Sequence, residues 1–413
     1  MNSTLDTSDA YAALRIRDFK WFVVSRFALT FGIQMQSVIV GWQIYEITHD
    51  ALSLGLIGLS EALPFFGISL FGGHVADKVS RKSIILSASA LYIICAAGLL
   101  LISTEFDSVL RAQGVLPIYA IIFVTGLARG FLSPSQNAFM AQLIPRELFG
   151  NASTWSSVSW QLAAVTGPAA GGLIYGFIGV GSAYSVVVVS TLVGFVCYTF
   201  VAKKPVPEHS KRESIMRSLS GGLRFVFHDQ IILSAISLDM FAVFFGGAVA
   251  VLPIFADQVL HTGAEGLGLL RAAPAVGSVV MSVTQAHYPF FKRAGRNLLI
   301  TVFCFGVVMI AFALSQNFYL SLILLLVSGM FDNVSVVIRN TIIQLQTPDE
   351  MRGRVSSVNG LFVSSSNEVG AFESGVAARF MGLVPSVIFG GTMALVVVAA
   401  VRKFAPKLRR LEL

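Results

Sequence analysis

The sequence has few charged residues and few cysteines. Only 12% of its 413 residues are Asp, Glu, Lys or Arg, whereas soluble globular proteins have about 25%. An ordinary soluble domain is therefore excluded. The three cysteines, Cys95, Cys197 and Cys304, lie far apart within apolar stretches, a placement that predicts neither a disulfide nor a thiolate metal site. The six histidines are scattered without metal-ligand spacing, so no metal site is expected.

Sequence motifs of ATP-driven and catalytic proteins are also missing. No Walker A sequence is present, so ATP hydrolysis is not expected to supply the energy. No nucleophile–base pair and no two-histidine metal motif occurs within the apolar segments. We therefore expect neither an enzyme nor a bound cofactor.

Long apolar segments make up most of the sequence. Hydrophobic residues make up 55% of the chain, in runs long enough to cross a bilayer, which takes about 20 helical residues. Strands of a β-barrel would be about 10 residues long and alternate apolar with polar residues. The sequence predicts an all-α membrane protein with spans near 21–46, 52–74, 83–103, 117–141, 153–178, 181–202, 230–256, 264–287, 297–315, 318–341, 354–381 and 383–401.

The positive charges indicate the topology of these spans. The formal net charge is +7, which in a soluble protein would suggest a nucleic-acid partner. With Met1 placed in the cytoplasm, however, Arg111 is the only Lys or Arg of the outer segments. This bias follows the positive-inside rule. We expect a multi-pass protein of the bacterial inner membrane, with both termini cytoplasmic, no nucleic-acid partner and a monomeric state.

The two halves of the chain resemble each other at an offset of 203 residues. Gly126 and Gly329, Pro145 and Pro348, and Gly179 and Gly382 are among the positions that coincide. The charged segment 203–229 separates six spans from six, and Ser214–Phe227 could form an amphipathic surface helix. The predicted domains are a six-helix bundle in 1–202, a cytoplasmic linker in 203–229 and a second bundle in 230–413. Duplicated helical halves are typical of transporters that bind substrate between them.

Ionisable residues deep in the spans are the first candidates for function. Each costs about 3 kcal/mol on insertion scales, so it is retained for a reason. Those farthest from the predicted ends are Glu61, Arg129, Asp239, Asp332, Glu368 and Glu373. We predict that they line a cavity for substrate and protons, where a carboxylate could exchange a proton near neutral pH. Structural salt bridges between helices are the alternative.

Two of these positions are equivalent in the repeat. The offset aligns Arg129 with Asp332, and opposite charges facing one cavity could form a pair that a proton or substrate breaks. Arg271 and Arg339 lie nearer the predicted ends and could extend to the interface, so they are not proposed as ligands. Phenylalanines near Glu61, including Phe65, could line an apolar cavity for a bulky solute.

Glycine marks the fifth span, at Gly167-Pro168-Ala169-Ala170-Gly171-Gly172. Pro168 removes a backbone hydrogen bond and bends the helix, while Gly167, Gly171 and Gly172 offer a face for close packing. A bent, closely packed helix suits a moving gate. Packing without a gating role is the other interpretation.

The segment between the second and third spans is charged, and it contains Gly73, Asp77, Lys78 and Arg81. Asp77 could lie at a helix N-terminus, and Arg81 could reach a carboxylate of the same bundle. Such a segment could hold the cytoplasmic helix ends together as a gate. A turn that only sets the topology is equally compatible with the spacing.

These motifs together resemble the major facilitator superfamily. Gly73-x-x-x-Asp77-Lys78-x-Ser80-Arg81 is similar to its signature between spans two and three, although Ser80 stands where the family usually has Gly. Arg129 resembles the family's buried arginine, and the Gly167–Gly172 motif resembles that of drug–proton antiporters. Gln344–Ser356 is similar to the branch that includes the bacterial enterobactin exporter. The resemblance implies two six-helix bundles that export a solute in exchange for protons.

We therefore predict a proton-coupled secondary transporter that works by alternating access and exports a small, partly apolar organic compound, either drug-like or a siderophore. Its partners would be that solute, protons and the lipid bilayer. Two alternatives stay open. One is an exporter or flippase of lipid-like or metal-related solutes, and the other is a receptor on a transporter fold.

Overall fold

The computed structural model describes residues 9–105, 107–205, 215–288, 293–348 and 350–412, except for the side chains of 69–78, 107, 215–219 and 286. This described part is helical and contains no strand. Contacts within the chain divide it into two compact units: Met1–Gln43 with Ser60–Lys211, and Ile44–Leu59 with Arg212–Leu413. The division falls in the predicted linker, but the short segment Ile44–Leu59 groups with the second half.

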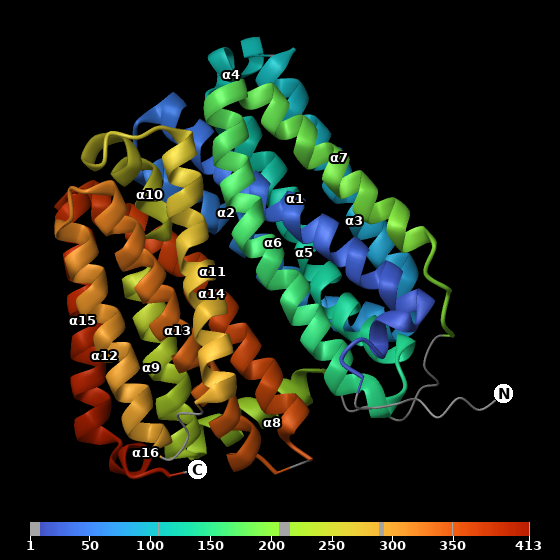
Figure 1. The fold of residues 1–413 in the computed structure, drawn as a ribbon, viewed down its shortest axis with the longest axis vertical. Helices are drawn as coiled ribbons and strands as arrows, with labels where there is room; N and C mark the ends of the chain where they lie inside the picture. Colours follow the sequence, from blue (N-terminus) through green and yellow to red (C-terminus); the bar gives the residue numbers. More distant parts are fainter. Residues whose placement is uncertain (1–8, 106, 206–214, 289–292, 349, 413) are drawn as a thin grey trace. The chain divides into compact units, whose positions relative to one another are not determined.

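The first unit contains most of the helices of the first half (Figure 1). They are α1 (Arg17–Thr48), α2 (Ala51–Lys78), α3 (Arg81–Thr104), α4 (Asp107–Gln113), α5 (Leu116–Leu143), α6 (Phe149–Ile178) and α7 (Val180–Thr199). The end of α1 and the first turns of α2 belong to the second unit. Within the first unit, α3 packs against α5 and α7.

The second unit begins with the linker helix α8 (Ile215–His228), in the segment where an amphipathic helix is predicted. It continues with α9 (Gln230–Gly246), α10 (Leu252–Ile254), α11 (Ala264–His287), α12 (Ala294–Leu314), α13 (Phe318–Gln346), α14 (Arg352–Met381), α15 (Leu383–Phe404) and α16 (Pro406–Arg409). Within it α12 packs against α13 and α15, as α3 packs against α5 and α7 in the first unit. The same neighbour relations in both units agree with the sequence repeat.

Eleven helices of the described part are long and apolar enough to cross a membrane. The remaining predicted span, 354–381, corresponds to α14, which is 30 residues long but rich in serine and carries Glu368 and Glu373. The twelve-span fold therefore agrees with the structure once this polar helix is included. Large apolar side chains such as Phe177 and Phe380, 76% and 83% exposed, are suited to lipid contact.

The repeat is visible in the turns that end two helices. Gly179 ends α6 with a φ of 111°, and Gly382 ends α14 with a φ of 89°. Only glycine adopts these positive values without strain. Because the two residues are equivalent at the 203-residue offset, the same tight turn recurs between α6 and α7 and between α14 and α15.

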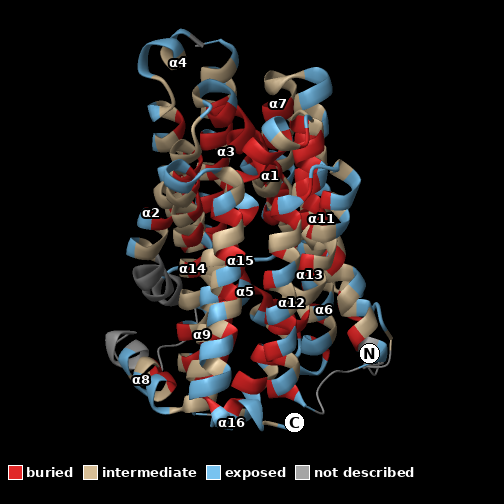
Figure 2. Ribbon diagram, turned by 90° about the vertical axis from the view of Figure 1, so that its left-hand side faces the viewer, coloured by how far each residue is buried: buried red, intermediate tan, exposed pale blue. Residues whose placement is uncertain are grey.

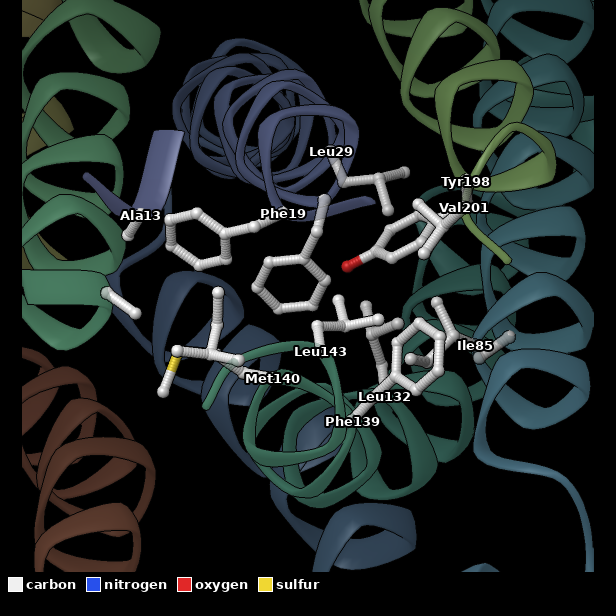
Figure 3. Packing of buried hydrophobic residues seen from close by; sticks show 14 of the residues in the cluster. Ala13, Phe19, Leu29, Ile85, Leu132, Phe139, Met140, Leu143, Tyr198 and Val201 are labelled. Atoms are coloured by element: carbon white, nitrogen blue, oxygen red, sulfur yellow. The ribbon is translucent and has the colours of Figure 1, made fainter. Parts of the chain in front are cut away.

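Aromatic side chains form much of the buried core of the first unit (Figure 3). The Phe22 ring lies 6.3 Å from that of Phe139 and 5.9 Å from that of Tyr198, edge to face in both cases. The hydroxyl of buried Tyr198 accepts a hydrogen bond of 2.9 Å from Gln136. Figure 2 shows buried and exposed residues on the same helices, as expected when one face packs and the other meets lipid.

Helix contacts in the second unit depend on glycine. A Cβ placed on Gly329 of α13 would lie only 2.0 Å from the carbonyl oxygen of Pro274 in α11. We expect Gly329→Ala to destabilise the protein by about 1–3 kcal/mol, because the two backbones must separate. Gly360 of α14 meets nothing within 4 Å, so Gly360→Ala should be stabilising by about 0.5–1 kcal/mol. Thermal unfolding in detergent measures both, and equal effects would contradict the packing argument.

Candidate functional site

An ion pair joins two helices of the first unit. Nη1 of Arg129 in α5 lies 2.7 Å from Oε1 of Glu61 in α2. The side chains keep 37% and 24% of their surface exposed. The guanidinium also lies 5.4 Å from the centre of the Phe65 ring, which is a cation–π distance. Both charges were predicted site residues, and the structure identifies Glu61 as a partner of Arg129.

Local sequence explains why these helices meet here. Pro64 lies inside α2 and cannot donate to the preceding turn, which favours a bend. A Cβ on Gly126 of α5 would lie 2.5 Å from the Glu61 carbonyl oxygen and 2.7 Å from Pro64. Glycine therefore lets the two backbones approach. Arg129 follows Gly126 by three residues, so it lies on the same face of α5 and meets Glu61.

A second ion pair lies inside the second unit. Asp239 of α9 pairs with Arg339 of α13, and their side chains are only 5% and 3% exposed. Ser335, one turn before Arg339, donates to Asp239 Oδ1 at 3.4 Å. The sequence placed Arg339 near the interface, and this was wrong, because the side chain is buried. The spacing Asp332, Ser335, Arg339 was the available signal, since steps of three and four residues share a helix face.

Asp239 also lines a small cavity, with Asp332 of α13 and Thr301 of α12. The space that the centre of a water molecule can occupy there is only about 10 Å³. That suffices for roughly one water molecule and is far below the 300–1,000 Å³ or so of a typical small-molecule pocket. The cavity therefore does not provide the predicted substrate contact of Asp239 and Asp332, which stays a prediction.

The two carboxylates of α14 lie in different surroundings. Glu368 is close enough to Arg271 of α11 for their charges to interact. Glu373 is followed by Ser374, whose hydroxyl donates at 3.0 Å to the carbonyl oxygen of Gly247, just beyond the end of α9. The seventh span is broken there, into short turns that reach Val259. Broken spans with exposed backbone groups are typical of transporter binding sites.

Arg271 is the second residue that the sequence did not propose. It follows Glu61 by 210 residues, as Pro274 follows Pro64. Gly329 packs on Pro274 as Gly126 packs on Pro64. Helices α2 and α11 therefore occupy equivalent positions in the repeat, but their residues correspond at an offset of 210 instead of 203. Arg271 in the second half thus stands at the position that Glu61 has in the first half. The offset of 203 was measured on later segments of each half, so it did not align these two residues.

The predicted gate segment differs from its expected form. α2 extends through Lys78, so only Val79 and Ser80 connect it to α3, and Gly73, Asp77 and Lys78 are helical instead of forming a loop. The side chains of these three residues lie outside the described part. Arg81 Nη1 donates at 2.8 Å to the carbonyl oxygen of Ala138 in α5, which ties α3 to α5. A gating role stays a prediction.

The glycine motif of the fifth span lies in α6 and faces α1. A Cβ on Gly167 would lie 2.9 Å from the Phe31 carbonyl oxygen, and one on Gly171 would lie 2.9 Å from that of Met35. Pro168 lies inside the helix, and Gly172 is buried. The predicted close packing is present, and the gating role of the motif stays a prediction.

The first turns of α2 contact α14 in the second unit. Gly55 lies against Gly375 so closely that a Cβ on Gly375 would be 2.6 Å from the Gly55 Cα. Asp50, just before α2, accepts hydrogen bonds of 3.0 Å from the backbone and hydroxyl of Ser53 and pairs with Arg379 of α14. These contacts hold the start of α2 on the end of α14.

This contact predicts a pH dependence. Burial disfavours ionised Asp50, but hydrogen bonds from Arg379 and Ser53 outweigh burial and hold the pKa of Asp50 below its ordinary value. A lowered pKa stabilises the fold above the ordinary value and loses that contribution as the pH falls through the lowered one. We expect Asp50→Asn to cost less than about 1 kcal/mol at pH 7, since Arg379 is half exposed.

The measurement is thermal unfolding of both proteins from pH 7 down to about pH 3. The two midpoints should converge at the acid end. Ser53→Ala is the control, because it removes the hydrogen bond from the Ser53 hydroxyl to Asp50 without removing the charge. A gap between Asp50→Asn and wild type that is unchanged at about pH 3 would argue against the ion pair.

Long apolar helices in two units, ion pairs between neighbouring spans and a broken seventh span define a multi-pass membrane transporter of the major facilitator type. The chain belongs to the transmembrane secretion effector family, which it matches over residues 8–412. This confirms the resemblance based on the motifs.

Two curated relatives that resemble this chain over most of its length are enterobactin exporters. The chain is 28% identical over 402 residues to "Enterobactin exporter EntS" of Shigella boydii serotype 18, covering 94% of this chain and 93% of the relative. The enterobactin exporter of Escherichia coli O1:K1 is equally similar, at the same identity and coverage.

Solved structures share the fold at low identity. A POT family transporter in complex with a thioalcohol-conjugated peptide superposes with a TM-score of 0.76 at 14% identity, covering 95% of this chain and 96% of the other. A bacterial homologue of the iron transporter ferroportin, in an inward-facing state, gives 0.70 at 16% identity, covering 94% and 98%. At such identities the likeness shows the fold alone.

Proposed function

We propose that this protein is a secondary exporter that moves a small, partly apolar organic compound out of the cell, and that this compound is a siderophore of the enterobactin type. The Glu61–Arg129 pair carries the proposal from the structural side. It lies within the spans but keeps 24% and 37% of its side-chain surface exposed, and an unshielded ion pair facing lipid would be costly. We infer that the Glu61–Arg129 pair faces a space that water can enter.

The surroundings of Arg129 suit an aromatic or anionic solute. The positive charge of the guanidinium attracts an anionic group, and the Phe65 ring beside it offers an apolar face. The similarity to enterobactin exporters over 94% of the chain supports the same class of solute. We extend the proposal to the inner membrane and to cytoplasmic termini, on the positive-inside bias of the sequence.

Exchange with protons and alternating access complete the proposal. In this cycle the binding site opens to one side at a time, and a carboxylate releases its proton inward when solute binds. The acidic residues Glu61, Asp332, Glu368 and Glu373 are the proposed carriers. Short inter-helix contacts such as Gly167 on α1 and Gly375 on α2 would have to be rearranged during the cycle.

Transport in proteoliposomes tests the proposal. The purified chain is reconstituted, and uptake of enterobactin and a panel of drug-like compounds is measured with and without an imposed pH gradient. We expect enterobactin transport that is driven by the gradient and stops when an ionophore collapses it. Transport that ignores the gradient would remove the exchange with protons. Absence of transport for every compound would remove the exporter itself.

A further inference from the structure

The last described residues of the chain are folded against the ends of other helices in the second unit. After α15 the chain turns at Ala405 into α16, and Leu408 is fully buried in the same apolar cluster as Ala294 of α12. The carbonyl oxygen of Phe404 accepts a hydrogen bond of 2.9 Å from Gln230, the first residue of α9. Figure 1 shows α16 beside the C-terminus at one end of this unit. The segment after the last span is therefore a packed element and not a free tail.

Gly295, in the first turn of α12, makes this packing possible. A Cβ on Gly295 would collide with the carbonyl oxygen of Leu408, and the Gly295 N–H donates at 3.2 Å to the carbonyl oxygen of Leu411. A residue without a side chain lets the two backbones approach this closely. Arg296 follows Gly295 and Arg410 precedes Leu411. The contact thus brings together cations from two distant parts of the chain.

Six exposed cations surround the packed segment, and we call them the C-terminal basic surface. They lie in the first turn of α12, in the last turn of α15, and in and just after α16. They are Arg296, Arg402, Lys403, Lys407, Arg409 and Arg410.

The C-terminal basic surface has few counterions of its own. No ion pair reaches any of its six cations from the part of the chain that the structure describes. Asp229, at the start of α9, instead accepts hydrogen bonds from two backbone N–H groups of that helix. Glu412 is exposed at the end of the chain. Because like charges that are gathered in this way repel one another, an anionic partner is favoured.

The positive-inside rule explains the sign of these charges but not their arrangement. Topology depends on the number of Lys and Arg residues near the span ends, which a free tail would supply equally well. The six cations instead lie at the ends of two candidate spans, Ala294–Leu314 and Leu383–Phe404. That is the depth of the lipid headgroups.

Apolar side chains beside the cations match the rest of a lipid. Phe404 is 71% exposed, and Nζ of Lys403 lies 5.5 Å from the centre of its ring. Aromatic side chains are enriched at the membrane–water interface. Ile300 is 46% exposed and follows Arg296 by four residues, so it lies on the same face of α12, one turn further into the span. A soluble anion would use the cations and leave these apolar side chains unmatched.

We propose that the C-terminal basic surface binds the headgroup of an anionic phospholipid. The planar fork of an arginine pairs with two phosphate oxygens, and the acyl chains lie along Ile300 and Phe404. Lipid binding does not depend on the proposed export. Only its assignment to the inner leaflet rests on the cytoplasmic C-terminus proposed above.

Lipid contact is measured at Phe404. The full-length chain with Phe404→Trp is reconstituted in phosphatidylcholine nanodiscs that contain a fixed fraction of brominated lipid, since bromine quenches the fluorescence of a nearby indole. The brominated lipid is either phosphatidylglycerol, which is anionic, or phosphatidylcholine, which has no net charge. The four native tryptophans give a background that is recorded on the unmodified chain. The ratio of the two quenching strengths is the lipid preference.

We expect brominated phosphatidylglycerol to be preferred about tenfold at low ionic strength, because each cation near an anionic headgroup contributes about fivefold when it is fully engaged. The preference should fall as sodium chloride is raised to about 0.5 M, which screens exposed charges. Replacing two cations, Arg409→Gln with Arg410→Gln, should lower the preference at least about fivefold. Both side chains are exposed, so this variant is expected to fold.

Two further variants in the Phe404→Trp background separate position from charge. Arg17→Gln with Lys20→Gln removes the same charge from exposed positions of the first unit and should leave the preference unchanged. Gly295→Ala keeps all six cations but disturbs the contact with Leu408, so it should lower the preference.

Equal quenching by the two lipids, or an unchanged preference in Arg409→Gln with Arg410→Gln, would overturn the proposal. A preference that survives Gly295→Ala would show that charge alone suffices and would overturn the packed surface. Inorganic phosphate that abolishes the preference, where chloride of equal ionic strength does not, would assign the surface to soluble anions instead of lipid. The readout does not involve transport. A chain that prefers phosphatidylglycerol and transports nothing in proteoliposomes would remove the exporter and leave the lipid surface, and the reverse result would do the opposite.

Discussion

Replacing Arg129 by methionine is expected to reduce transport by about a hundredfold. Loss of one member of a hydrogen-bonded charge pair costs about 2–5 kcal/mol when the other is left unpaired, and about 2.7 kcal/mol corresponds to a hundredfold change. In this variant Glu61 loses the guanidinium that lies 2.7 Å away, and the solute loses a positive charge beside Phe65. The initial rate of enterobactin uptake into proteoliposomes measures the effect.

Three further variants test why transport falls in Arg129→Met. Arg129→Lys keeps the charge but not the planar fork, so it should retain part of the rate. Glu61→Gln should lower transport as well, because it leaves Arg129 without its carboxylate. Arg146→Met removes an exposed arginine outside the long helices and should transport normally. Normal transport by a folded Arg129→Met protein would assign the pair a purely structural role.

The buried pair of the second unit should have its largest effect on stability. Arg339→Met leaves Asp239 buried at 5% exposure without its partner, which typically costs about 3–5 kcal/mol. The double variant Asp239→Leu with Arg339→Met replaces both charges by apolar groups and should recover most of that loss. Thermal and denaturant unfolding in detergent are measured for the double variant and for both single variants, Arg339→Met and Asp239→Leu. The loss in the double variant minus the two single losses gives the coupling between the residues.

The comparison has an internal control. The Glu61–Arg129 pair is much more exposed, so neutralising one member should change stability less than it does at the buried pair. If the double variant in the second unit is as unstable as the two single losses added together, the residues do not act as a pair. The coupling would then be zero within error.

Much of the fold could be predicted from the sequence because hydropathy acts locally. Apolar runs long enough to span a bilayer must become helices, since every backbone group needs a partner within its own segment. The charged linker, the amphipathic α8 and the repeated turn glycines Gly179 and Gly382 follow from the same local reasoning. Among the predicted spans, as far as the structure describes them, α14 alone gives a weak hydropathy signal, because its serines and carboxylates make it polar.

The partners of the charges could not be predicted in this way. Depth in a span singled out Glu61 and Arg129, but their contact depends on the close approach of α5 to α2 at Gly126 and Pro64. Distance from a predicted helix end misjudged Arg339, which is buried. α13 in fact reaches Gln346, beyond the predicted end of its span, so Arg339 lies in its interior.

The sequence by itself determined which residues enter the membrane and which of them are costly there, because transfer free energy is a property of each residue and its neighbours in the chain. Tertiary structure alone decided that both Asp239 and Asp332 line a water-sized cavity and that Asp239 is the one paired with Arg339. These two carboxylates look alike in the sequence. What separates them is the side chain that another helix brings within a few ångströms, since charge interactions depend on distance in space.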